Sequence, residues 1–150
     1  MGQETLKLNA KAQKFSDFLA AKEITCFNVQ QAEDELHTAV FRSTMEVGGS
    51  TLPVALVLDD SIYGMLRVQV VPRAVQGDNK AALLEYINTQ NRTYKVFKYY
   101  LAENGALFLD SCILLANDQE NGPMIYVVIE VLLKHLQETY PALMRTIWGK

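Results

Sequence analysis

The sequence predicts an α+β fold in which an antiparallel sheet of five or six strands is accompanied by helices at the N-terminus, in the middle and at the C-terminus. The first observation is an alternation of apolar and polar residues over three successive stretches between residues 37 and 71, typical of strands with one face toward a core. The second is a turn sequence at each break between these stretches. The third is apolar spacing of three and four residues in three other segments, which indicates amphipathic helices. Because the strands come in blocks, the predicted order α-(β)βββ-α-ββ-α favours an antiparallel sheet.

Residues 4–22 are predicted to form the first helix. Lys7, Lys11 and Lys14 fall between its apolar positions, so we expect a packing helix with a solvated lysine face. Acidic residues in the same segment argue against a membrane-surface helix. The apolar positions are Leu8, Ala12, Phe15, Phe18 and Leu19.

Three strands are predicted over residues 37–47, 51–59 and 62–71, and a shorter strand over 24–29 precedes them. Gly48-Gly49-Ser50 and Asp59-Asp60-Ser61 are predicted to be the turns between the three. The residues expected to face the core are Ala39, Phe41, Met45, Val47, Leu52, Val54, Leu56, Leu58, Ile62, Leu66, Val68 and Val70.

The second half is predicted to hold a helix, a hairpin and a long final helix. Asp78 or Asn79 is expected to cap the helix, which runs to about Asn91. Strands over 94–102 and 106–115 follow, joined by Asn104-Gly105, which suits a type I′ turn. The final helix is predicted to begin at Asn121-Gly122-Pro123. Pro141 is expected to bend or interrupt it, with Trp148 still packed on the body.

Length and composition favour one domain over residues 1–150, since a chain of 16.9 kDa with 49% apolar and 21% charged residues is close to the globular average. The net charge of −3 argues against a nucleic-acid partner. No apolar stretch is long enough to cross a bilayer and the first residues do not resemble a signal peptide, so we expect a cytoplasmic protein without a membrane partner. Cys26 and Cys112 are expected to be free, buried thiols.

No residue pattern predicts a catalytic, cofactor or metal site. His37 and His135 lack the spacing of metal ligands and are predicted to be surface or boundary residues. Neither Cys26 nor Cys112 lies in an electropositive setting that would activate a thiol. We therefore expect no enzyme, no cofactor and no metal.

Acidic and basic clusters also have simple explanations. Asp59-Asp60 and Glu33-Asp34-Glu35 fall in predicted turns and lack calcium-loop spacing, while Gly48-Gly49 lacks the lysine of a phosphate loop. Residues 92–100 mix bases with aromatic residues, a pattern that stacks single-stranded nucleic acid in other proteins. A strand packed on a helix at one face and on a partner protein at the other gives the same pattern, and the negative net charge favours this second interpretation.

The second half resembles the YbjN-like family, whose members are related in fold to type III secretion chaperones. The resemblance depends on a helix ending in an N-x-x-N pattern, an Asn-Gly turn and a closing YP-x-L-M motif. It implies a type III secretion chaperone-like fold and a non-enzymatic domain that binds other proteins, commonly as a dimer. The matching residues are Asn88, Asn91, Gly105, Tyr140, Pro141, Leu143 and Met144.

Three functions therefore compete. A protein-binding, chaperone- or adaptor-like module, with a regulatory role as one option, predicts exposed apolar surface and is the function we expect. A small-molecule or lipid-binding domain predicts a closed apolar cavity between the sheet and the last helix. An enzyme predicts His37 or His135 beside a carboxylate or thiol in a cleft. Because Phe97, Tyr99 and Leu101 share one strand face and Tyr94, Val96 and Tyr100 the other, we expect a homodimer or another protein partner.

Overall fold

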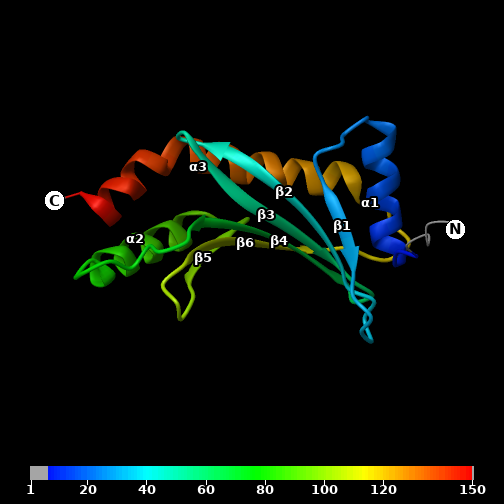
Figure 1. Ribbon diagram of the computed structural model, residues 1–150, viewed down its shortest axis with the longest axis horizontal. Coiled ribbons are helices and arrows are strands. Elements are labelled where there is room, and N and C mark those ends of the chain that lie inside the picture. Colours follow the sequence, from blue (N-terminus) through cyan, green and yellow to red (C-terminus); the bar gives the residue numbers. More distant parts are fainter. Residues whose placement is uncertain (1–6, 150) are drawn as a thin grey trace, which may run out of the picture.

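A computed structural model describes residues 7–149 and has the expected α+β architecture. The helices are α1 (Ala10–Ala21), α2 (Lys80–Thr93) and α3 (Gly122–Trp148). The strands are β1 (Asn28–Gln31), β2 (Ala39–Val47), β3 (Ser50–Leu58), β4 (Tyr63–Val71), β5 (Lys98–Leu101) and β6 (Leu107–Leu114). Figure 1 shows α3 running along the sheet, with α1 near one of its ends and α2 near the other.

The six strands form one sheet in the order β1-β2-β3-β4-β6-β5, and every neighbouring pair is antiparallel. Gly48 and Gly49 form the expected β2–β3 turn, with the two positive φ angles, 56° and 82°, of a type I′ turn. The type I′ turn predicted at Asn104-Gly105 is wrong, because only Gly105 has a positive φ there, 87°, and the N–H of Gly105 donates to the oxygen of Ala102. Pro53 lies in β3 just beyond Val54, where the pairing of β3 with β4 ends, so its missing N–H removes no bond from that ladder.

One face of the sheet is buried under the helices. The expected core residues of β2 and β3 are all buried, as are Leu66, Val68 and Val70 of β4, whereas Ile62 lies in the turn before β4 and is 59% exposed. The helix α3 covers this face with residues spaced three and four apart, as expected for an amphipathic helix. These are Ile125, Val128, Leu132, Leu136, Tyr140, Leu143 and Ile147.

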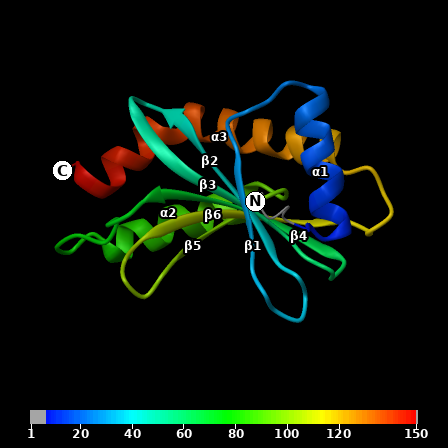
Figure 2. The same cartoon turned by 45° about the vertical axis from the view of Figure 1, so that its right-hand side comes forward.

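The helix α3 is the element to which both other helices attach. Figure 2 shows α1 beside its first turns and α2 below its last turns. A Cβ atom at Gly122 would lie 2.1 Å from Cγ of Phe18, so only glycine permits this approach of α1. At the other end, the side-chain amide of Asn79 donates to the backbone oxygen of Ile147. Asn79 is the N-cap position of α2, as expected, but its side chain makes no capping bond.

The last turns of α3 differ in part from expectation. The helix continues through Pro141 without interruption, and Figure 1 shows its C-terminal part at an angle to the rest. Trp148 is 54% exposed, so its expected packing on the body is wrong. Ile147 and Leu143 occupy the buried positions of this turn instead.

Polar contacts hold α1 in place, and one of them corrects the sequence prediction. Lys11 does not lie on a solvated face but is fully buried, with its ammonium donating to the backbone oxygens of Ser61 and Tyr63 at 2.6 Å each. Burial lowers the pKa of Lys11, and the nearby Asp59 and Asp60 oppose this shift. The sequence pattern predicts a solvated Lys11, but the aliphatic part of its side chain packs beside the apolar residues of α1. Its ammonium reaches the β3–β4 turn, which the pattern of a single helix does not reveal.

Replacing Lys11 by methionine is expected to lower the free energy of unfolding by about 2–4 kcal/mol, because two backbone oxygens lose their donor. The measurement is urea unfolding followed by circular dichroism. The exposed Lys22 provides the control, since Lys22→Met should change the stability by less than about 0.5 kcal/mol. Equal effects of the two substitutions would contradict the anchoring role of Lys11.

Candidate functional site: an unpaired strand edge beside an apolar groove

Among residues 7–149, no strand pairs with the second half of β2 on its outer edge. The short strand β1 pairs only with Ala39 to Arg42. Its first residue, Asn28, is the partner of Arg42, so the pairing goes no further along β2. The N–H of Ala32 donates to the oxygen of Thr38, so the backbone groups of Thr38 point toward the β1 side. Backbone groups alternate between the two edges of an antiparallel strand. Those of Thr44 and Glu46 therefore point to the same outer edge, beyond the end of β1.

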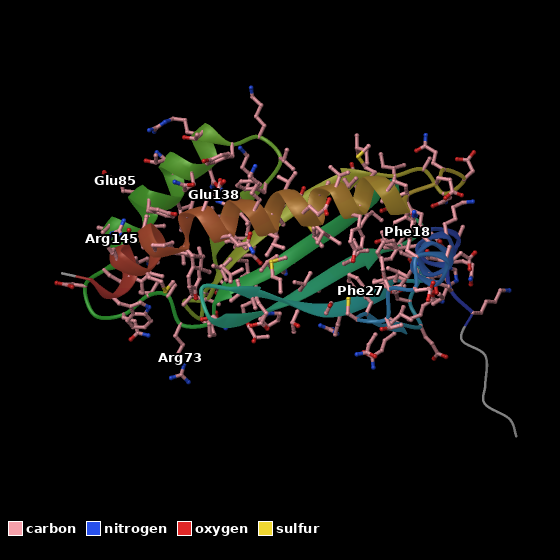
Figure 3. The ribbon with its side chains drawn as sticks, turned by 90° about the horizontal axis from the view of Figure 1, so that it is seen from above. Phe18, Phe27, Arg73, Glu85, Glu138 and Arg145 are labelled. Atoms are coloured by element: carbon pink, nitrogen blue, oxygen red, sulfur yellow. The ribbon has the colours of Figure 1, made fainter. Side chains whose placement is uncertain are left out.

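An apolar groove runs beside this edge, between β2 and α3. Its volume is about 440 Å³ and it is open to solvent. Cys26, Glu46 and Glu130 add a thiol and two carboxylates to its lining. Figure 3 shows Phe27 beside the strands, on the side of α1, where its ring contacts Phe15 edge to face. The apolar lining consists of Phe27, Met45, Val54, Tyr126, Ile129 and Leu133.

The opposite face of the sheet carries no helix. Its central feature is Arg67, whose guanidinium donates two hydrogen bonds of 2.9 Å to the carboxylate of Asp110 and lies over the rings of Tyr100 and Phe108. A hollow of about 350 Å³ lies over Ala55, between Arg67 and Arg42. This surface, which we call the open face, is the main part of the fold left uncovered by the described residues.

Both cysteines are exposed, which corrects the expectation of buried thiols. Cys26 lines the groove and Cys112 lies on the open face, opposite Met65 of β4. The prediction for Cys112 is wrong because both faces of β6 carry apolar residues, so the sequence does not show which face is buried. The buried face is the one with Leu109 and Ile113, and Cys112 lies on the other. The two thiols lie on different surfaces, and neither is near a histidine ring in the described contacts.

His37 lies at the surface and pairs with a carboxylate. Its Nδ1 is 2.6 Å from Oδ2 of Asp60, and the two side chains are 61% and 38% exposed. This fulfils one condition of the enzyme prediction, a histidine within hydrogen-bond reach of a carboxylate. The nearby hydroxyl of Ser61 contacts the carboxylate of Asp59 and so is not directed at the histidine. His37 lines a pocket of about 380 Å³ together with Lys7 and Asn9, but the pocket is open to solvent, and no thiol or hydroxyl of the described residues is hydrogen-bonded to the ring.

His135 is buried rather than at the surface, and it belongs to an aromatic cluster between α3, β5 and the turn that precedes it. Its Nε2 is 2.8 Å from the hydroxyl of Tyr99, and its ring lies 4.3 Å and 4.7 Å from those of Phe97 and Tyr94. Burial lowers the pKa of His135 to about 4 and raises the pKa of Tyr99 above its usual range. The cluster holds α3 on β5.

The remaining candidates are structural. Asp34 accepts a hydrogen bond from the N–H of Thr38, and Asp59 from that of Ser61, as expected for turn residues. Between residues 7 and 149 no group of acidic, histidine or cysteine side chains is arranged to hold a metal ion. In the same part of the chain no helix is long and apolar enough to span a membrane.

Comparison with known proteins supports the fold. No family model and no curated protein matches the chain, so the YbjN-like resemblance stays a prediction. A chain in the crystal structure of the ExsC-ExsE complex superimposes with a TM-score of 0.60 at 17% sequence identity, covering 92% of this chain and 97% of that chain. The type III secretion chaperone-like fold is thereby confirmed.

The burial of His135 predicts a pH dependence of stability. Because its pKa is about 4 in the folded protein and 6.5 in the unfolded chain, folding favours the neutral ring. The contribution is fully present above pH 6.5 and is lost as the pH falls toward 4, by up to about 3 kcal/mol. Urea unfolding at several pH values should show this slope flattened in His135→Gln. The control His37→Asn changes a histidine whose side chain is 61% exposed and should retain most of the slope. An unchanged slope in His135→Gln would contradict the assignment.

Proposed function

We propose that this protein is a non-enzymatic, chaperone- or adaptor-like module that binds an extended segment of another protein. The single observation that carries the proposal is the unpaired half of β2 lying beside an apolar groove. A strand added along this edge gains hydrogen bonds from the backbone of Thr44 and Glu46. Every second side chain of such a strand points to the same face of the sheet as the groove. The apolar lining then buries those side chains.

The charges at the groove favour a partner segment that contains basic residues. Glu46 and Glu130 belong to the lining, and the chain as a whole carries a net charge of −3. Opposite charges at the rim contribute to orientation and to the rate of association more than to affinity. The expected partner segment is therefore extended and alternates apolar residues with polar or basic ones.

The two alternative functions fit the structure less well than protein binding does. A lipid- or small-molecule-binding domain predicts a closed cavity between the sheet and α3, whereas this groove is open along a strand edge. An enzyme requires a nucleophile or metal near a titratable group, which the described surroundings of His37 and His135 lack. The fold likeness to a chain from a protein complex is consistent with the same conclusion. The exposed free thiols fit a reducing compartment, such as the cytoplasm.

The homodimer expected from the sequence remains a prediction. The sequence favours a homodimer because aromatic and aliphatic residues alternate onto both faces of the strand around β5. In the structure Phe97 and Tyr99 are covered within the chain by His135 and its neighbours, while Tyr100 stays exposed on the other face. The surface that remains in need of cover is therefore the open face rather than the whole of β5.

A proline at position 44 is expected to abolish binding of the partner without unfolding the protein. Proline lacks the N–H that would bond the added strand, and it is tolerated where that N–H points away from the sheet. The matched control, Thr44→Val, keeps the N–H and should bind normally. Melting curves of both variants check the fold.

The binding measurement uses Cys26 as a probe of the groove. In a Cys112→Ser variant, a thiol-linked photocrosslinker at Cys26 is expected to capture a partner from native extract, identified by mass spectrometry. Capture should disappear on adding Thr44→Pro and persist with Thr44→Val. The same crosslinker at Cys112, in a Cys26→Ser variant, reports on the opposite face. Equal capture from both positions, or capture unaffected by Thr44→Pro, would refute the groove as the binding site.

A further inference from the structure

One row of residues across the middle of the open face carries more positive than negative charge. These residues lie side by side on neighbouring strands, and three of them are cations whereas one is an anion. The chain as a whole has a net charge of −3, so the positive row is a local feature of this face. The row consists of Asn28, Arg42, Ala55, Arg67, Asp110 and Lys98.

The hollow over Ala55 lies within this row. Arg42 on β2 and Arg67 on β4 are the partners of Ala55 on its two sides, and both line the hollow, whose volume is about 350 Å³. Neighbouring strands are about 4.8 Å apart, so the backbones of the two arginines are separated by about 10 Å. Because alanine is short and arginine is long, a group placed over Ala55 has a guanidinium on either side. The rest of the lining contains no acidic residue and consists of Ser43, Pro53, Val54, Gln69 and Phe108.

The two arginines differ in how the chain uses them. Arg67 donates from Nε and Nη2 to the carboxylate of Asp110 and lies over the rings of Tyr100 and Phe108, so its guanidinium is held in place. Its Nη1 has no hydrogen-bond partner among the described residues. Arg42 is exposed and forms no ion pair with a described residue. The hollow therefore has one fixed and one unpaired guanidinium with N–H donors to spare.

Lys98, the third cation of the row, is already occupied. Its ammonium donates to the backbone oxygens of Asn91 and Tyr94 at the end of α2. The single carboxylate of the row, that of Asp110, is likewise taken up by Arg67. The charge left without a partner in this row is thus that of Arg42, at the edge of the hollow.

We propose that the hollow over Ala55 binds the phosphate group of a small phosphate monoester, with Arg42 and Arg67 on its two sides. Guanidinium groups form short, charge-assisted hydrogen bonds with oxyanions. The pair of Arg67 with Asp110 shows that one guanidinium occupies both oxygens of a carboxylate. A phosphate monoester has three terminal oxygens and close to two negative charges, so it provides acceptors for two guanidiniums at once.

The remaining lining of the hollow indicates what the phosphate is attached to. Pro53, Val54 and Phe108 give it apolar walls, and Gln69 adds an amide. Small-molecule sites have volumes of about 300–1,000 Å³, so a hollow of about 350 Å³ takes a small ligand. The expected ligand is a phosphate on a single ring or a short apolar chain. Phenyl phosphate has this chemistry and serves as the probe.

The first test is a titration of the ¹⁵N-labelled protein with phenyl phosphate, followed by the NMR shifts of the backbone amides. At pH values above about 7 the phosphate carries close to two negative charges. We expect saturable shifts centred on Ala55 and Arg67. Benzoate, which has the same ring and a carboxylate, should bind at least tenfold more weakly, because its two oxygens serve only one guanidinium.

The second test removes the unpaired guanidinium. Arg42→Gln should weaken binding of phenyl phosphate at least tenfold, and the fold should be unaffected because Arg42 is exposed and unpaired among the described residues. The control Arg73→Gln makes the same charge change at an exposed position beyond the end of β4, labelled in Figure 3. It should leave the affinity unchanged.

The third test fills the hollow without changing a charge. Ala55→Leu places a larger side chain where the phosphate is expected, so binding should be lost. The matched control is Val57→Leu, which enlarges the next outward-facing residue of the same strand and should bind normally. Melting curves of both variants check the fold.

A peptide with one phosphotyrosine separates a free ester from a phosphorylated protein. We expect it to bind no more tightly than phenyl phosphate, because the hollow has room for little beyond the phosphate and one ring. Binding at least tenfold tighter would assign the phosphate to a protein and overturn the small ester as the ligand.

Four further results would overturn the proposal. These are shifts that stay linear with phenyl phosphate concentration, saturable shifts centred on another surface, an affinity unchanged by Arg42→Gln or Ala55→Leu, and benzoate binding as tightly as phenyl phosphate. Each leaves the groove proposal untouched, because the groove lies on the other side of the sheet and is measured through Cys26 and the backbone of Thr44. Loss of partner capture in the groove experiment would equally leave these titrations unaffected.

Discussion

The packing of α3 on one face of the sheet is the interaction on which the other features depend. A helix of 27 residues is about 40 Å long and the six strands together are about 24 Å wide, so α3 alone reaches across the sheet. The shorter α1 and α2 attach to its two ends, at Gly122 and Ile147. Because all three helices are used on this face, no helix of the described residues covers the other face. The division of the molecule into a helical side and an open side follows from this single packing arrangement.

The proposed strand contact depends on the backbone of the sheet. At the edge of β2 the binding groups are backbone donors and acceptors, which pair with many sequences and leave selectivity to the apolar lining of the groove. An edge contact therefore suits a variable extended segment. On the open face, by contrast, a central side chain is already paired within the chain, as Arg67 is with Asp110.

Sequence alone predicts the architecture well and the surfaces poorly. The alternation in β2 and β3 identifies their buried face because polar residues such as Arg42 and Thr44 occupy the other face. In β6 both faces are apolar, so Cys112 was assigned to the wrong side. Lys11 follows the lysine pattern of α1, yet its burial depends on the β3–β4 turn, 50 residues away. The unpaired edge of β2 depends on the residue at which β1 begins, and the boundaries of strands are the least predictable feature of a sequence. The expected strand at 24–29 was found at Asn28–Gln31.

The attachment of α1 affects how the chain folds during its synthesis. The side-chain amide of Asn121 donates to the backbone oxygen of Lys11, a contact between residues 110 positions apart. A ribosome adds about 5–20 residues per second, so Lys11 is made roughly 5–20 seconds before its partner. During this interval Phe18 lacks its contact with α3 at Gly122. The first helix of this protein is thus attached in two stages, to the β3–β4 turn through Lys11 and only later to α3.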